Sequence, residues 1–130
     1  MIVFFPHIPK AGGQTLIQGF YKAFGTKKCI KVWDPNFGAD VSSDNFYKLS
    51  DKEFEGISAI VGHLPLLKFL KNNYIEKEFK KGNILIFTCV REPILRMISL
   101  YNYITYFEKH PLHEKIVKLS PVDSTFGVSH

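Results

Sequence analysis

Apolar residues in this chain form four short continuous runs, separated by stretches in which they recur at helical spacing. The runs are typical of buried strands and span residues 2–5, 28–33, 57–62 and 83–90. Helical patterns occupy 15–24, 66–80 and a segment that Pro93 opens. Strands that alternate with helices form parallel βαβ units. The pattern therefore predicts an α/β fold with three α/β/α layers, in which helices cover both faces of a mainly parallel sheet.

Polar and turn-forming residues indicate what happens between these elements. The basic helix 66–80 is expected to break near Asn72-Asn73 and to end at Lys81-Gly82. The Ser50-x-x-Glu53 pattern predicts another helix start. The remaining expectations are a loop at 34–43, a weak helix at 44–49, a short helix at 112–119 and irregular structure at 120–130.

Composition fits one folded domain over residues 1–130. Hydrophobic residues make up 45% of the chain, which argues against disorder. The net charge of +5 favours anionic partners, but the sequence lacks an RNA-binding signature, so no nucleic acid is expected. Cys29 and Cys89 are too few for a zinc site or a disulfide scaffold, and are interpreted as buried thiols or one bridge. The histidines and carboxylates show no metal-ligand spacing, so no metal is expected.

The segment His7–Thr15, with the sequence HIPKAGGQT, lies between the first strand and the first helix. Glycines let the backbone approach a ligand, and the N–H groups and dipole at a helix start favour phosphate or sulfate. Lys10 adds a positive charge and Thr15 a hydroxyl. Lys10 precedes both glycines, unlike the lysine of a Walker A loop. The segment therefore predicts an anion-binding turn of another kind, and a glycine-rich turn with a solvated lysine is the alternative.

A second motif follows the run 83–90 and begins with Arg91-Glu92-Pro93. Its position predicts that Arg91 lies at the carboxyl end of a strand, where ligands bind in open parallel sheets. Ser99 lies about two turns into the following helix, roughly 9 Å along its axis from Pro93. Arg91 and Ser99 could therefore hold one phosphate together. An arginine paired with a nearby glutamate and a solvent-facing serine are the alternative.

Together the two motifs, HxPKxGG-x-T and R-[DE]-P-x-x-R-x-x-S-x-Y, resemble those of sulfotransferases that use PAPS (3′-phosphoadenosine 5′-phosphosulfate). The similarity is greatest to the carbohydrate branch that includes heparan sulfate 2-O-sulfotransferases. The resemblance implies a P-loop-NTPase-like sulfotransferase fold. It also implies a 3′-phosphate site at Arg91 and Ser99. The 5′-phosphosulfate loop that it implies consists of Lys10, Ala11, Gly12, Gly13, Gln14 and Thr15.

The chain departs from that family's pattern in two respects. Ala11 and Gln14 stand where the family usually has Thr or Ser, so two hydroxyl donors are missing, although backbone N–H groups can do much of the binding. Family members usually extend well past the end of this chain, which implies either a minimal member or a fragment. The sequence has no signal peptide and no run long enough to span a bilayer. We expect a cytoplasmic protein of bacterial or viral origin, or a lumenal Golgi domain if the chain is a fragment of an anchored enzyme.

Sulfuryl transfer needs a cation near the leaving oxygen and a base for the acceptor hydroxyl. Lys10 is the expected cation, with the N–H groups of Gly12 and Gly13. His63 is the expected base, because it follows the third predicted strand and the family has its catalytic histidine in a similar Gly-His segment. The other candidates are a structural His7, the tail histidines and two carboxylates. These tail and carboxylate candidates are His110, His113, His130, Asp34 and Glu92.

Three functions follow from these residues. The expected one is transfer of a sulfuryl group from PAPS to a carbohydrate or other hydroxyl-bearing acceptor, including an anionic glycan. A nucleotide kinase of P-loop type is disfavoured by the position of Lys10. The third is a non-catalytic module that binds a nucleotide or a glycan. Its support is that the carboxyl-terminal segment usual in the family is not identifiable in this sequence.

Overall fold

The computed structural model describes residues 1–119, which form two compact units. Unit 1 is Met1–Cys89, and unit 2 begins at Val90. The segment 120–130, predicted to be irregular, and the base candidate His130 lie outside the described residues.

Unit 1 contains a four-stranded sheet in which every strand pair is parallel. The strands are β1 (Ile2–Pro6), β2 (Cys29–Val32), β3 (Ala59–Gly62) and β4 (Ile84–Ile86), in the order β2-β3-β1-β4. The α-helices are α1 (Gly13–Phe24), α2 (Leu66–Leu70) and α3 (Asn73–Lys80). This confirms the α/β fold with a parallel sheet.

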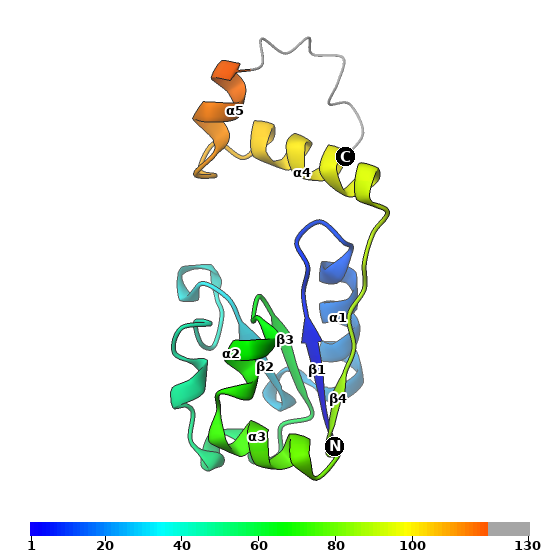
Figure 1. Cartoon of the computed structure of the whole chain (residues 1–130), viewed down its shortest axis with the longest axis vertical. Coiled ribbons are helices and arrows are strands. Elements are labelled where there is room, and N and C mark those ends of the chain that lie inside the picture. The colour runs from blue at the N-terminus through cyan, green and yellow to red at the C-terminus, as the bar shows by residue number, and fades with distance from the viewer. Residues whose placement is uncertain (120–130) are drawn as a thin grey trace. The chain divides into compact units, whose positions relative to one another are not determined.

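Alternation along the strands sends successive side chains to opposite faces of the sheet. On one face Phe5 of β1 packs with Ile17 of α1 and Val61 of β3. On the other face Phe4 stacks on Phe69 of α2, with ring centroids 3.8 Å apart, in a cluster that includes Ile75 of α3. Figure 1 shows α1 and α2 on opposite sides of the strands. Unit 1 therefore has the three layers that the sequence predicts.

The predicted helix 66–80 is broken where expected, and Asn72 is the reason. Its carboxamide oxygen accepts hydrogen bonds from the N–H groups of Tyr74 and Ile75, which begins α3. The segment between β2 and β3 contains short 3-10 helices in place of the α-helices that the pattern suggests. These are Pro35–Phe37, Phe46–Lys48 and Asp51–Phe54, and another, Thr26–Lys28, precedes β2.

The run 83–90 contains a strand, as its apolar pattern predicts, but the strand is shorter and less buried than expected. β4 contains only Ile84–Ile86, and Leu85 and Ile86 are 51% and 38% exposed. The physical reason is position, because β4 is an edge strand and pairs only with β1 within the described residues. Beyond Ile86, contact with β1 continues through the N–H of Phe87, which donates to the carbonyl of Phe4.

Unit 2 contains α4 (Pro93–Tyr106) and α5 (His113–Leu119), both near the predicted positions. Pro93 occupies the first turn of α4, and the Glu92 carboxylate accepts hydrogen bonds from the N–H groups of Ile94 and Leu95. The imidazole Nδ1 of His113 lies 2.7 Å from the carbonyl oxygen of Ile104, which joins the two helices. No helix within residues 1–119 is long and apolar enough to cross a membrane.

Both cysteines are free thiols. Cys29 is buried beside α1, and its thiol lies 3.9 Å from the carbonyl oxygen of Phe20. The thiol of Cys89 donates to the carbonyl of Ala11 at 3.0 Å. Of the two interpretations of the cysteines, separate thiols is therefore the correct one, and Cys89 ties the end of unit 1 to the loop after β1.

Candidate functional site

The chain leaves β1 and β3 in opposite directions, although the two strands are neighbours in the sheet. After β1 it crosses through α1 on one face to reach β2, and after β3 it crosses through α2 and α3 on the other face to reach β4. Such a point of divergence leaves a crevice at the carboxyl ends of the strands, and ligands bind there in open α/β sheets. The residues that follow β1, β2 and β3 define the candidate site.

The loop after β1 leads into α1 with an unusual backbone. Lys10 has φ 62° and Gly12 has φ 81°, both in the left-handed region, and a lysine is uncommon there. Gly12 is the N-cap of α1, and no side chain within residues 1–119 caps the helix. Gly12, Gln14 and Thr15 are exposed. The start of α1 therefore presents its N–H groups and dipole without a protein carboxylate or hydroxyl to satisfy them.

Gly13 brings this helix start against the end of β1. A Cβ atom at Gly13 would overlap the imidazole ring of His7, so only glycine allows the contact. Ala11, in the same loop, is buried and its carbonyl is bonded to Cys89. The His7 ring is therefore held directly against the backbone at the start of α1.

Three rings gather at the carboxyl ends of the three central strands. His7 follows β1, Trp33 follows β2 and His63 follows β3. The His7 and His63 centroids are 4.8 Å apart with the rings edge to face, and Trp33 lies 3.7 Å from His63 at 83°. The backbone fixes this arrangement, because the N–H of His63 donates to the carbonyl of Val32 at 2.8 Å. His63 is therefore one ring away from the helix start at Gly13.

Burial keeps both imidazoles neutral at physiological pH. Burial lowers the pKa of His7. Burial, and secondarily the charge of His7, lower the pKa of His63 to about 4. Within residues 1–119, Nδ1 of His7 and Nε2 of His63 are buried and have no hydrogen-bond partner. Buried polar atoms are nearly always bonded in folded proteins, so two unbonded atoms in adjacent rings point to a functional role.

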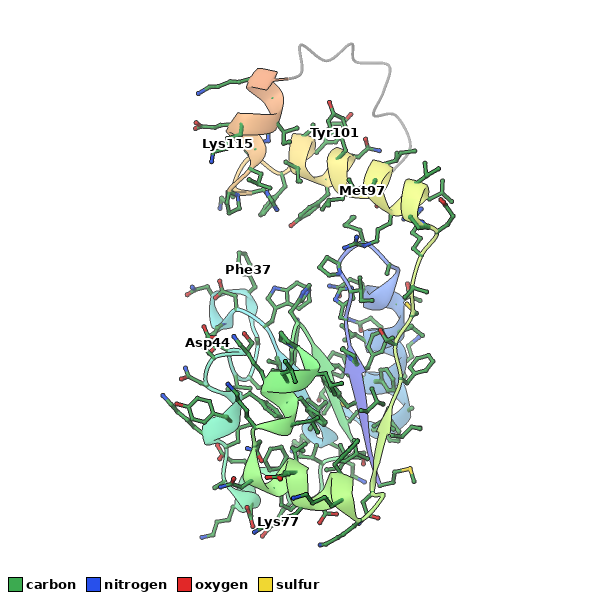
Figure 2. All side chains as sticks on the ribbon, viewed as in Figure 1. Phe37, Asp44, Lys77, Met97, Tyr101 and Lys115 are labelled. Atoms are coloured by element: carbon green, nitrogen blue, oxygen red, sulfur yellow. The ribbon has the colours of Figure 1, made fainter. Side chains whose placement is uncertain are left out.

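A cleft of about 330 Å³ opens beside His63. Its lining comes from the end of β3 and from the segment after β2, and consists of Trp33, Asp34, Pro35, Ser42, Ser43 and His63. The volume is within the range typical of small-molecule sites. Figure 2 shows Phe37, on the same segment, at the end of unit 1 toward which the strand arrows point.

The carboxylates that were alternative bases both have structural partners. Asp34 accepts a hydrogen bond from the N–H of Asn36 at 2.9 Å and lines the cleft. Glu92 caps α4, and the hydrogen bonds from Leu95 and Ile94 hold its pKa below the usual value. Of the tail histidines, His110 accepts from the N–H of Leu112 and His113 bonds Ile104. These contacts favour His63 over the other candidates.

The second predicted motif lies in unit 2. Arg91 was expected at the end of a strand, but β4 ends at Ile86 and residues 87–90 are irregular. Arg91 is exposed just before α4, and Ser99 is half-buried in that helix. Thus unit 1 brings the start of α1, His7 and His63 together, whereas Arg91 and Ser99 belong to unit 2. Their shared role in binding the 3′-phosphate stays a prediction.

Four residues that line the cleft were not predicted from the sequence, namely Trp33, Pro35, Ser42 and Ser43. Trp33 was included in the second predicted strand, which ends one residue earlier at Val32. A signal was available, because Trp33 is the single tryptophan of the chain and stands at the end of an apolar run. Ser42 and Ser43 gave no comparable signal within the loop 34–43.

Comparison with known proteins identifies one family. The sulfotransferase family profile matches residues 2–125, nearly the whole chain. No curated protein and no solved structure matches the chain.

Proposed function

This chain belongs to the sulfotransferase family, and we propose that it moves a sulfuryl group from PAPS to a hydroxyl of a carbohydrate acceptor. One observation supports this most strongly. The uncapped start of α1 lies against His7, which in turn contacts His63, at the point where the chain diverges after β1 and β3. An anion site and a neutral imidazole are thus adjacent, as transfer of a charged group to a hydroxyl requires.

The loop after β1 fits the 5′-phosphosulfate of PAPS. The N–H groups at the start of α1, which no side chain within residues 1–119 caps, can donate to its oxygens, and the helix dipole favours its negative charge. Gln14 and Thr15 add an amide and a hydroxyl on the exposed side of the helix start. Ala11 would shape the loop more than it contacts the ligand, because its N–H donates to the carbonyl of Ile8 and its carbonyl accepts from Cys89.

Lys10 would stabilise charge that develops during the reaction. The acceptor oxygen forms a bond to sulfur while the bond between sulfur and the 5′-phosphate oxygen breaks, and the electron pair leaves with the phosphate. A positive charge beside that oxygen is worth more in the transition state than in the bound substrate. Loss of one such donor typically costs about 3–4 kcal/mol in activation free energy.

His63 would accept the proton of the acceptor hydroxyl. Its imidazole is neutral at pH 7, so the nitrogen lone pair is available. The low pKa of His63 without ligand makes its imidazole a weak base. The negative charge of bound PAPS nearby would raise that pKa toward neutral pH, where a general base works best. The proton therefore passes from the acceptor oxygen to His63 and the sulfuryl group passes to the acceptor.

Arg91 and Ser99 would bind the 3′-phosphate of the nucleotide. Arg91→Ala should then weaken PAP (adenosine 3′,5′-bisphosphate) by about tenfold or more, while adenosine 5′-phosphosulfate, which lacks the 3′-phosphate, binds unchanged. Isothermal titration calorimetry measures both affinities, and Lys115→Ala, an exposed lysine of the same unit, is the matched control. Equal losses for both ligands would remove this assignment.

Thermal unfolding in the presence of PAP, ATP or heparin separates the three candidate functions. A ligand at 100 times its dissociation constant adds about 2.7 kcal/mol to stability. A sulfotransferase should be stabilised most by PAP, a kinase by ATP and a glycan-binding module by heparin alone. Lys10→Ala should then reduce turnover of PAPS by about 10²–10³-fold and PAP affinity much less. Normal turnover in this variant would contradict the role of Lys10.

A further inference from the structure

The cleft beside His63 has a different chemistry from the loop that faces the nucleotide. Its walls combine the indole of Trp33, the ring of Pro35 and three oxygen-bearing side chains, Asp34, Ser42 and Ser43. Within residues 1–119, the hydroxyls of the two serines have no hydrogen bond, and the carboxylate of Asp34 accepts only the N–H of Asn36. The cleft therefore has hydrogen-bonding capacity that the protein does not use.

An indole beside free oxygen atoms suits a sugar ring. The C–H face of a pyranose packs on an aromatic surface, while its hydroxyls bond to carboxylate and hydroxyl groups at the ring edge. Trp33 is only half-buried, so part of its surface is available to a ligand. His63 lines the same cleft, so a hydroxyl of a bound sugar would be next to the imidazole.

The charge of the cleft discriminates between classes of sugar. Asp34 is the one charged side chain in the lining. Lys31, whose Nζ lies 5.7 Å from the centre of the Trp33 ring, is outside the lining. A uronate or a sulfate in this cleft would face the Asp34 carboxylate without a compensating cation in the lining, and like charges at close range repel. An uncharged ring meets no such penalty.

We propose that the cleft of Trp33, Asp34, Pro35, Ser42, Ser43 and His63 is the acceptor site, and that it selects an uncharged sugar over a uronic-acid or sulfated glycan. This inference rests on the proposed function, because the acceptor must be next to the base. It also differs from what the net charge of the whole chain suggests, since the +5 charge would favour an anionic glycan. The local charge at the site determines the preference.

The single tryptophan makes this cleft directly observable. The probes are a β-1,4-glucan tetrasaccharide and the same tetrasaccharide oxidised to the 6-carboxylate, titrated into the full chain with PAP present. Trp33 fluorescence should change on binding, and the neutral probe should bind about tenfold more tightly than the carboxylated one. Asp34→Asn should reduce this ratio to within about threefold, whereas Asp51→Asn, an exposed acid elsewhere in unit 1, should leave it unchanged.

Three results would overturn the proposal. One is no fluorescence response to the neutral probe up to about 10 mM. The second is equal or tighter binding of the carboxylated probe, and the third is a ratio that Asp34→Asn does not change. These readouts need no turnover, and stabilisation by PAP is measured separately. A chain that PAP stabilises but that fails this test loses only the acceptor proposal, whereas one without a PAP response loses the proposed function.

Discussion

Two sets of buried polar side chains in unit 1 differ in whether the protein itself supplies their hydrogen-bond partners. Asn72 is fully buried beneath the 3-10 segment, donates to the carbonyls of Phe46, Tyr47 and Leu49, and accepts from two N–H groups of α3. His7 is 8% exposed, and its Nδ1 is unbonded within the described residues, as is Nε2 of His63. Asn72 lies between α2 and α3, whereas His7 and His63 follow β1 and β3.

This difference distinguishes structure from function. A fully bonded buried amide fixes one local conformation, and at Asn72 it joins the segment 46–49 to the start of α3. A buried imidazole nitrogen without a hydrogen-bond partner lowers the stability of the fold. His7 and His63 lie where the chain leaves β1 and β3 in opposite directions. We therefore infer that their unbonded nitrogens have a role in binding the ligand or in its reaction. Substitutions in the two regions should therefore have opposite consequences.

The largest effect is expected at His63. His63→Ala should reduce sulfuryl transfer by about 10²–10⁴-fold and leave PAP affinity nearly unchanged, because a base acts on the acceptor and not on the nucleotide. Transfer of labelled sulfate from PAPS at saturating acceptor measures the rate, and calorimetry measures the affinity. His110→Ala is the matched control and should behave as wild type. Full transfer by the His63 variant would point to Asp34, the carboxylate in the same cleft.

Asn72→Ala should have the opposite profile. The variant loses the cap of α3 and removes the Asn72 amide from three carbonyls of the segment 46–49, of which, among the described residues, only that of Phe46 keeps another donor, the N–H of Leu49. The free energy of unfolding should therefore fall by about 3 kcal/mol. Urea unfolding measures this loss. Asn73→Ala, at the exposed neighbouring position, should change stability by less than about 0.5 kcal/mol. A fall in turnover per folded molecule, with stability unchanged, would reverse the distinction between the two regions.

Two glycines of α1 make the comparison sharper. Gly13→Ala places a methyl group against the His7 ring and should cost about 1–3 kcal/mol, with weaker PAP binding because the helix start must shift. Gly19→Ala meets open space and should stabilise the protein by about 0.5–1 kcal/mol through helix propensity. Unfolding curves for both variants test the sign. Equal shifts would mean that His7 is free to move.

The pH dependence of stability is expected to be smaller than the effects at His63 and Asn72. The pKa of His63 is about 4 in the folded chain and close to 6.5 when unfolded, so the unfolded state binds more protons between these values. Stability should therefore be complete above pH 6.5 and decrease as pH falls toward 4, by about 1–2 kcal/mol after allowance for solvent screening. His63→Gln should lose less than wild type over pH 6.5–4.5. Identical losses would show that the folded pKa of His63 is not lowered.

The local chemistry of the sequence was sufficient to predict much of this structure. The apolar runs located all four strands of the sheet, the glycines located the helix start after β1, and Asn72 located the break between α2 and α3. His63 was proposed as the base from its place after the third strand together with the family's similar Gly-His segment. Each of these features depends on neighbours within a few residues.

The features that escaped prediction depend on contacts between distant parts of the chain. An apolar run is the same in a central and an edge strand, so the exposure of β4 could not be read from it. The cleft depends on how the segment after β2 folds back, where Val41 pairs with Val32 and the Asp40 carboxylate accepts from the N–H of Lys31 at 2.7 Å. Nothing in the sequence of that loop specifies those partners.

One titration tests the central claim, that the region with unsatisfied polar groups is the site and the region with satisfied ones is not. Amide chemical shifts of the full chain are followed by NMR as PAP is added. The claim predicts large changes at Gly12, Gly13 and Gln14, with the amides of Tyr74 and Ile75 at the Asn72 cap unmoved. Changes at Tyr74 and Ile75 without changes in the loop, or no change in the loop at saturating PAP, would contradict it.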